Sequence, residues 1–349
     1  WVEFSYSPEI SIRLDILKEN GLSLPKNFEE LTTTFETVMK NWKGEQKPYL
    51  PLYGSKVYKF GMDQKSYDSW PYWVYDDMFY VNQSTGEVKN YFETTEFKHD
   101  CENANTWYKK GLINPDVLVV QQEQLDAQLD SGNWFVHAGT YGKSIDNIKK
   151  SYPNITIDDF EFLNFFPKKP NMRPYGTRNM NAIPTTSKNP EVGVKLFNWI
   201  YANQDNYDLY MYGRENVDFK KTGERTREDI IDLAKGRPLY FADDWMAGNL
   251  SFERLAGNSP RKTELLKFTI DKTAVDSIAG TFVFDATNVK AELANVRTEM
   301  AANITPIACG VLDYDSAIGS ALTKLKNAGI EKVINEYKTQ FEAFKAKNK

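Results

Sequence analysis

Cysteine is scarce in this 349-residue sequence: only Cys101 and Cys309 are present, and they lie far apart along the chain. Two cysteines exclude a disulfide framework, and their separation excludes a Cys-x-x-Cys metal motif. A single long-range disulfide and two unrelated buried thiols are both compatible with the sequence, and we interpret them as unpaired thiols. Neither a zinc ribbon nor a disulfide scaffold is therefore expected.

Long apolar runs and catalytic motifs are missing as well. No run approaches the roughly 18 residues that a membrane-spanning helix needs. The sequence contains no HExxH, GxSxG, GxGxxG or P-loop pattern, which are the signatures of common hydrolases and nucleotide-binding enzymes. A net charge of −5 argues against a nucleic acid as partner. We expect a neutral, hydrogen-bonding ligand, with no metal and no cofactor.

The most interpretable stretch is Met180–Phe219. Asn189 followed by Pro190 predicts a helix start, because proline at the first helical position loses no hydrogen bond. A second helix is predicted to stop at Gly213. Apolar residues recur at helical spacing on one face of the first helix. That face consists of Gly193, Leu196, Phe197, Ile200 and Tyr201.

Helices and short strands alternate along the rest of the chain. Asn27, with Glu30 three residues later, predicts another helix start. A helix from about Thr95 is predicted to end before Gly111, and Val81–Val88 is typical of a hairpin. The length is sufficient for two domains, and the alternation favours an α/β fold with mostly parallel strands.

Aromatic residues make up 14% of the sequence, and they are densest at Tyr67–Trp73, where four rings fall within seven residues. One face of a helix or strand cannot bury them all. Planar rings stack on the apolar faces of sugars while their polar edges hydrogen-bond, so the cluster indicates a sugar-binding surface. The alternative is that Trp70 and Trp73 fill a core.

The stretch Ser131–Tyr141 predicts a strand that ends near a ligand. Its alternation places Trp134 on a buried face. His137, on the other face, is interpreted as a packed residue rather than a ligand or a base. Open α/β sheets bind ligands beyond the carboxyl ends of their strands, so Thr140 and Tyr141 are expected to face a cleft.

Several stretches resemble extracellular solute-binding proteins of family 1, the binding components of ABC importers. The resemblance rests on Met180–Phe219, on GLINPD at Gly111–Asp116 and on Ser131–Tyr141. Near the end of the chain, Thr281–Val289 and Leu312–Phe344 resemble the closing region of a Gram-positive lipoprotein subgroup of that family. Together these stretches cover most of the chain in order.

The resemblance implies an α/β, periplasmic-binding-protein-like fold of type II, with two lobes, a hinge and an interlobe cleft. It implies that residues 1–162 form the second lobe, that 163–280 return to the first lobe, and that 281–349 pack back on the second. It also implies that the first lobe is incomplete without residues upstream of Trp1, including a lipid-anchored N-terminus. The expected location is the extracellular face of the membrane or the periplasm.

The resemblance also implies which residues contact the ligand. Tyr67 and Trp70 match a family cluster whose tyrosine lies on the sugar, and Tyr72 belongs to the same cluster. Two shorter matches place hydrogen-bonding side chains beside an aromatic ring. They are Trp245 with Asn249, and Phe284 with Asp285.

The function implied is that of an ABC importer's substrate-binding protein, which captures an oligosaccharide, delivers it to the permease and is not an enzyme. A glycoside hydrolase is the first alternative, but it needs two carboxylates about 5–10 Å apart across the bond. The adjacent pairs Asp76-Asp77, Asp158-Asp159 and Asp243-Asp244 splay their side chains apart and are interpreted as loop or cap residues. A surface lectin or a peptide-binding lipoprotein without a transport role is the second alternative.

Overall fold

The computed structural model describes residues 10–50, 78–138, 148–170, 172–173, 181–233, 237–240, 242–249, 251–256 and 274–348. The chain divides into two compact units. The larger unit consists of Ser7–Pro174 and Val275–Lys349, and the smaller unit of Trp1–Tyr6 and Tyr175–Ala274. The chain thus crosses between units after residues 6, 174 and 274, where the sequence predicted crossings after 162 and 280.

A three-stranded sheet in the larger unit has β1 (Ile10–Arg13) between β4 (Val136–Ala138) and β5 (Phe160–Leu163). Both neighbours run antiparallel to β1. The prediction of mostly parallel strands is therefore wrong for the described residues. Their only parallel strand pairs are β11 (Leu255–Ala256) with β8 (Thr226–Asp229) and β12 (Val275–Asp276) with β6 (Met172–Arg173). Alternation along the chain does not specify pairing, because β1 finds both partners more than a hundred residues away.

Helices α2 (Phe28–Asn41) and α3 (Thr95–Lys109) of the larger unit begin where the sequence predicted them. The larger unit also contains α1 (Leu14–Glu19) and α4 (Gln122–Ser131). The Asn27 side chain accepts a hydrogen bond from the Glu30 backbone N–H at 2.8 Å, which confirms the predicted cap. Gly111, with φ of +67°, follows the end of α3 as expected.

The core between these helices and the sheet is centred on Trp107. Its ring lies 5.3 Å from the rings of both Phe28 and Phe35, and its Nε1 donates to the Thr32 hydroxyl at 2.7 Å. Trp134 is buried as predicted, but Phe135 is buried too. The chain leading into β4 is therefore covered on both sides.

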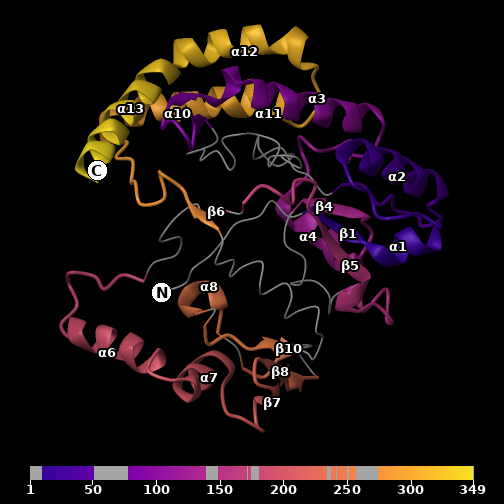
Figure 1. Ribbon diagram of the computed structural model, residues 1–349, viewed down its shortest axis with the longest axis vertical. Coiled ribbons are helices and arrows are strands. Elements are labelled where there is room, and N and C mark those ends of the chain that lie inside the picture. The colour runs from indigo at the N-terminus through magenta and orange to yellow at the C-terminus, as the bar shows by residue number, and fades with distance from the viewer. Residues whose placement is uncertain are drawn as a thin grey trace. The chain divides into compact units, whose positions relative to one another are not determined.

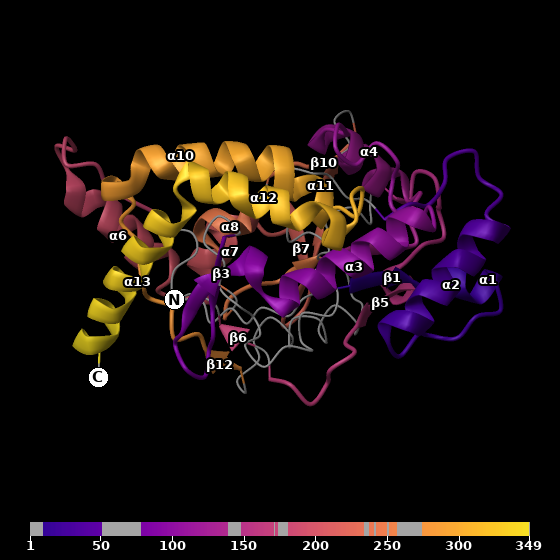
Figure 2. The same ribbon diagram turned by 90° about the horizontal axis from the view of Figure 1, so that it is seen from above.

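The C-terminal helices of the larger unit form a second core around the hairpin of β2 and β3. In Figures 1 and 2, α11 and α12 lie beside α3 in both views. The rings of Phe79 in the hairpin, Phe284 and Tyr337 pack together with centroids 4.3 to 5.9 Å apart. The elements are β2 (Phe79–Val81), β3 (Val88–Asn90), a 3-10 turn (Tyr91–Glu93), a 3-10 turn (Thr287–Val289), α10 (Lys290–Glu299), a π-helix (Met300–Ile304), α11 (Thr305–Ala308), α12 (Tyr314–Ala328) and α13 (Ile330–Lys347).

Helix α3 contributes to both cores of the larger unit: Cys101 packs in the core of the C-terminal helices, and Ala104 and Trp107 pack in the core of the sheet. Both cysteines are free and buried. Burial raises the pKa of the Cys309 thiol to about 12 and also raises that of Cys101, so both thiols stay protonated and unreactive at neutral pH.

Tyr337 supplies a stability test in the second core. Its hydroxyl is buried and has no hydrogen-bond partner in the part of the chain that the structure describes. Tyr337→Phe removes the hydroxyl and, with it, the free-energy cost of burying it without a partner. The variant should therefore be as stable as the wild-type protein, or more stable by about 1 kcal/mol, in denaturant unfolding. Tyr91→Phe is the matched control, because the Tyr91 hydroxyl donates to Asp100 at 3.3 Å in the same core, and it should destabilise. Equal losses in both variants would contradict an unpaired Tyr337 hydroxyl.

The smaller unit contains α6 (Pro190–Ile200) and α7 (Gln204–Tyr212), with Pro190 at the first helical position and Gly213 after the second helix at φ of +85°, as predicted. Its strands are β7 (Phe219–Gly223), β8 (Thr226–Asp229), β9 (Ile231–Asp232), β10 (Arg237–Pro238) and β11 (Leu255–Ala256).

The larger unit also contains a 3-10 turn (Ile157–Asp159), β6 (Met172–Arg173) and β12 (Val275–Asp276). Because β6 and β12 pair, the two strands next to the crossings between units lie side by side.

Two details of α6 differ from expectation. The Asn189 side chain makes no capping hydrogen bond, since its backbone lies outside the extended region that capping residues adopt. On the predicted apolar face only Ile200 is fully buried, whereas Leu196 is 46% exposed. Helical spacing defines which residues share a face, but not what packs on it.

None of the helices in the described ranges is long and apolar enough to cross a membrane.

Candidate functional site

The predicted ligand contacts are distributed unevenly over the described chain. Trp245 and Asn249 lie in the smaller unit, and Phe284 and Asp285 in the larger. The residues of the aromatic cluster and of the strand end lie outside the described residues. These are Tyr67, Trp70, Tyr72, Thr140 and Tyr141.

Trp245 lies on α8 (Asp244–Ala247), and the segment 244–249 is here called the α8 segment. Several backbone groups of this segment form hydrogen bonds with side chains rather than with other backbone groups. The Tyr201 hydroxyl donates to the Ala247 carbonyl at 3.0 Å, and the Asn181 amide Nδ2 donates to the Met246 carbonyl at 2.7 Å. The Asn249 N–H donates to the hydroxyl of Tyr207 at 2.9 Å.

Asn249 is 9% exposed, and its side-chain oxygen accepts from the Ser251 N–H at 3.0 Å. Its Nδ2 has no hydrogen-bond partner among the described residues. An amide fixed through its oxygen, with its nitrogen still available, can donate to a hydroxyl of a ligand.

The tyrosines behind the α8 segment belong to the core of the smaller unit. Tyr207 is fully buried, with its ring 5.5 Å from Phe252 and 6.0 Å from Tyr212. The Tyr212 hydroxyl accepts the backbone N–H of Arg254 at 2.9 Å. Burial raises the pKa of Tyr212 to about 12 and that of Tyr207 well above its usual range, so both hydroxyls are protonated at neutral pH.

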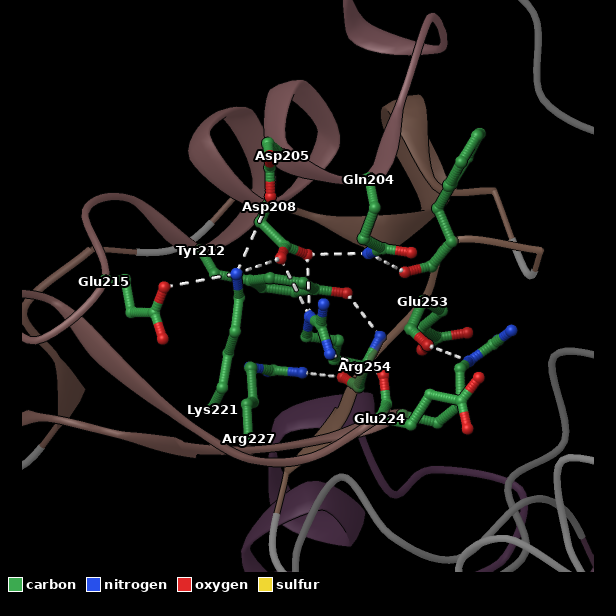
Figure 3. A network of polar contacts seen from close by, with 12 residues as sticks. Gln204, Asp205, Asp208, Tyr212, Glu215, Lys221, Glu224, Arg227, Glu253 and Arg254 are labelled. Atoms are coloured by element: carbon green, nitrogen blue, oxygen red, sulfur yellow. Dashed lines mark hydrogen bonds and ion pairs between the residues drawn. The ribbon is translucent and has the colours of Figure 1, made fainter.

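A polar network beside this core was not predicted (Figure 3). The single Nε–H of Arg254 is shared between the two carboxylate oxygens of Asp208, at 2.8 and 2.9 Å, and Gln204 donates to Asp208 at 2.7 Å. Lys221 lies 3.6 Å from Asp208 and 3.1 Å from Glu215, and its hydrogen bond to Glu215 raises the pKa of Lys221 despite some desolvation. The only signal for this network in the sequence was the spacing of four between Gln204 and Asp208, because Arg254, the other partner of Asp208, lies 46 positions away.

Phe284 and Asp285 have structural contacts in the second core. Phe284 is buried against Phe79 and Tyr337. Asp285 accepts hydrogen bonds from the backbone N–H and the hydroxyl of Thr287 at 2.9 and 2.5 Å, which lower the pKa of its carboxyl. These contacts hold both side chains in place, and their role as ligand contacts remains a proposal.

The chemistry available at the α8 segment is hydrogen bonding through the Asn249 amide, which is a neutral donor and acceptor. The hydroxyls of Tyr201 and Tyr207 already bond to the backbone of the segment. Among the described residues, no group of three or more His, Cys, Asp or Glu side chains could hold a metal ion. Such a surface is suited to a hydroxyl-rich, uncharged ligand.

Solved structures define the class of fold. The N-glycan transport solute binding protein NgtS from Streptococcus pneumoniae superposes with a TM-score of 0.74 at 20% identity, over 100% of this chain and 75% of that one. Its complex with Man5GlcNAc gives 0.68 at 22% identity, over 100% and 74%. An HMO binding ABC-transporter associated solute binding protein from Bifidobacterium longum infantis gives 0.60 at 14%, over 98% and 75%. The fold is therefore that of solute-binding proteins, periplasmic-binding-protein-like, as the sequence predicted.

Sequence comparison identifies a relative of this chain among solute-binding proteins. Over 325 residues the chain is 28% identical to a Streptococcus pneumoniae serotype 4 protein named carbohydrate ABC transporter substrate-binding protein. The match covers 90% of this chain, and the chain spans 62% of that relative's length. Residues 278–346 match a family described as Domain of unknown function (DUF3502), which includes both C-terminal stretches of the resemblance. The resemblance to solute-binding proteins of ABC importers is thus confirmed.

Proposed function

We propose that this protein binds an oligosaccharide outside the cytoplasm and delivers it to the permease of an ABC importer. The observation that carries the proposal is the similarity to a carbohydrate ABC transporter substrate-binding protein over 90% of the chain. Structures of the same fold include NgtS in complex with Man1GlcNAc and with Man5GlcNAc. The extracellular face of the membrane or the periplasm follows as the location, with a lipid anchor as the means of attachment.

The proposed ligand contacts come from two groups of residues. Rings that stack on the sugar are Tyr67, Trp70, Tyr141 and Trp245, with Tyr72 and Thr140 beside them. Asn249 donates from its amide to a sugar hydroxyl, which is consistent with its available Nδ2. Stacking provides affinity and directional hydrogen bonds provide orientation, as in most small-molecule sites.

Delivery to a permease requires that the ligand favour one conformation of the two units. A ligand shifts such an equilibrium only by its differential affinity for the two states. We therefore expect ligand-dependent compaction in small-angle scattering. Binding without compaction favours a surface lectin, and hydrolysis of the bound oligosaccharide favours a glycoside hydrolase.

Calorimetric titration with Man5GlcNAc and with fructo-oligosaccharides tests the proposal and its residues. Tyr141→Ala and Trp70→Ala should each weaken binding at least about tenfold, because truncated stacking rings at binding sites typically cost ~2 kcal/mol. The melting temperature of the ligand-free protein should fall by no more than about 4 °C. Trp134→Ala should instead destabilise by about 3–5 kcal/mol, because Trp134 is buried.

Trp199→Ala is the control for these variants, since Trp199 is 42% exposed on α6 and outside the proposed site; it should leave the affinity unchanged. If Trp134→Ala binds poorly but melts normally while Tyr141→Ala unfolds, the strand faces the opposite way. If the wild-type protein binds neither Man5GlcNAc nor the fructo-oligosaccharides, the proposed oligosaccharide-binding function is rejected.

A further inference from the structure

The α8 segment depends on side chains for its conformation. Helix α8 has four residues, and the last carbonyls of a helix have no partner within it. Tyr201 and Asn181 satisfy the carbonyls of Ala247 and Met246, at 3.0 and 2.7 Å. Side chains from elsewhere in the smaller unit thus help to fix the end of α8.

The three side chains that hold the segment come from different parts of the smaller unit. Asn181 precedes α6, Tyr201 is the C-terminal cap of α6, and Tyr207 lies within α7. The Tyr201 ring stacks on Phe197 with centroids 6.1 Å apart, and Tyr207 is fully buried. Both rings belong to the core of the smaller unit, which also includes Ala247 of the α8 segment, so packing positions two of the three hydroxyl or amide groups.

We infer that Asn181, Tyr201 and Tyr207 are positioning residues for oligosaccharide binding, which act by holding the backbone that carries Trp245 and Asn249; this inference rests on the proposed function. A ring that stacks on a sugar and an amide that hydrogen-bonds to it must both be held to within about 0.5 Å. If the segment were ordered only by the ligand, part of the binding energy would be lost to that ordering.

Hydroxyl-deletion variants test the inference, with a matched control in the same unit. Tyr240 also donates from its hydroxyl to a backbone carbonyl, that of Tyr210, at 2.7 Å, but Tyr210 lies on α7 and outside the α8 segment. We expect Tyr201→Phe and Tyr207→Phe to weaken the binding of Man5GlcNAc about fivefold, the size of one neutral hydrogen bond. Tyr240→Phe should change the affinity less than about twofold.

A double-mutant cycle separates positioning from general stability. If Tyr201 acts through Trp245, the fivefold effect of Tyr201→Phe should fall below about twofold in a Trp245→Ala background, because coupled residues are not additive. A purely structural role predicts the same loss in both backgrounds and a loss of equal size in Tyr240→Phe; either result would overturn the inference. A wild-type protein that binds none of the oligosaccharides would overturn the proposed function and this inference together, whereas normal wild-type binding with additive variants overturns the inference alone.

Discussion

Gly310→Ala should destabilise the larger unit by about 3–5 kcal/mol, or prevent it from folding. Gly310 follows α11 with φ of +78°, a region that L residues enter at a cost. A Cβ at this position would lie 2.2 Å from the carbonyl oxygen of Ala104 and 2.6 Å from the backbone N of Asn105. Both atoms belong to the α3 backbone, so no side-chain rotation can relieve the overlap.

The backbone of α3 has little freedom to move away. Its Cys101 packs in one core of the larger unit and its Trp107 in the other. In addition, the Asn105 amide donates to the Gly310 carbonyl at 2.8 Å in a buried position, and this bond requires the close approach. The variant should therefore lose the hydrogen bond, or the packing of one core, or both.

Gly111→Ala is the control that separates backbone conformation from crowding. Gly111 has φ of +67°, but nothing lies within 4 Å of a Cβ built there. It should cost about 1 kcal/mol, the penalty for the left-handed conformation alone. Denaturant unfolding of both variants decides the matter, and equal losses would mean that α3 and residue 310 are further apart than described.

Arg254→Met should destabilise the smaller unit by about 3–5 kcal/mol, because it leaves the carboxylate of Asp208 buried without its main partner. The side chains of Arg254 and Asp208 are 8% and 4% exposed. Arg254 also donates through Nη1 to the carbonyls of Gly223 and Glu224, at 3.2 and 2.5 Å, which would lose that donor (Figure 3). The loss should appear in the hydrogen exchange of α7 amides and in the denaturation midpoint.

A second variant distinguishes a broken pair from a lost contact. Removing both charges in Asp208→Leu with Arg254→Met should recover most of the stability, because a buried pair replaced by apolar side chains is often neutral. Lys98→Met, which removes the exposed ion pair with Asp315 at 2.7 Å, should leave the midpoint nearly unchanged. If Arg254→Met behaves like Lys98→Met, the pair is solvated and the described burial is incorrect.

Local signals in the sequence were sufficient for the ends of helices and for the hairpin. Asn27 caps α2, Pro190 begins α6 and Gly213 follows α7, because capping and left-handed backbone depend on the residue itself and its near neighbours. The turn with Gly86 joins β2 and β3 for the same reason. Order along the chain also supported the resemblance to solute-binding proteins.

The candidate site was only partly accessible to such reasoning. The match at Trp245 and Asn249 identified a segment, but not the hydroxyls of Tyr201 and Tyr207 that hold it, which come from residues more than forty positions earlier. The match at Phe284 and Asp285 rested on residue types that suit a sugar site and a packed core equally well. Only the tertiary structure shows that Phe284 packs against Phe79 and Tyr337, and that Asp285 accepts hydrogen bonds from Thr287.

What the sequence determined by itself was therefore the class of fold, the ends of the helices and the presence of aromatic rings suited to a sugar. Tertiary structure decided that β1 pairs with β4 and β5 in antiparallel fashion, and that Arg254 pairs with Asp208. It also decided that α6 leaves Leu196 exposed. The physical reason is range: caps and turns are energies of a few adjacent residues, whereas strand pairing, buried ion pairs and covered faces depend on which distant surfaces can exclude water together.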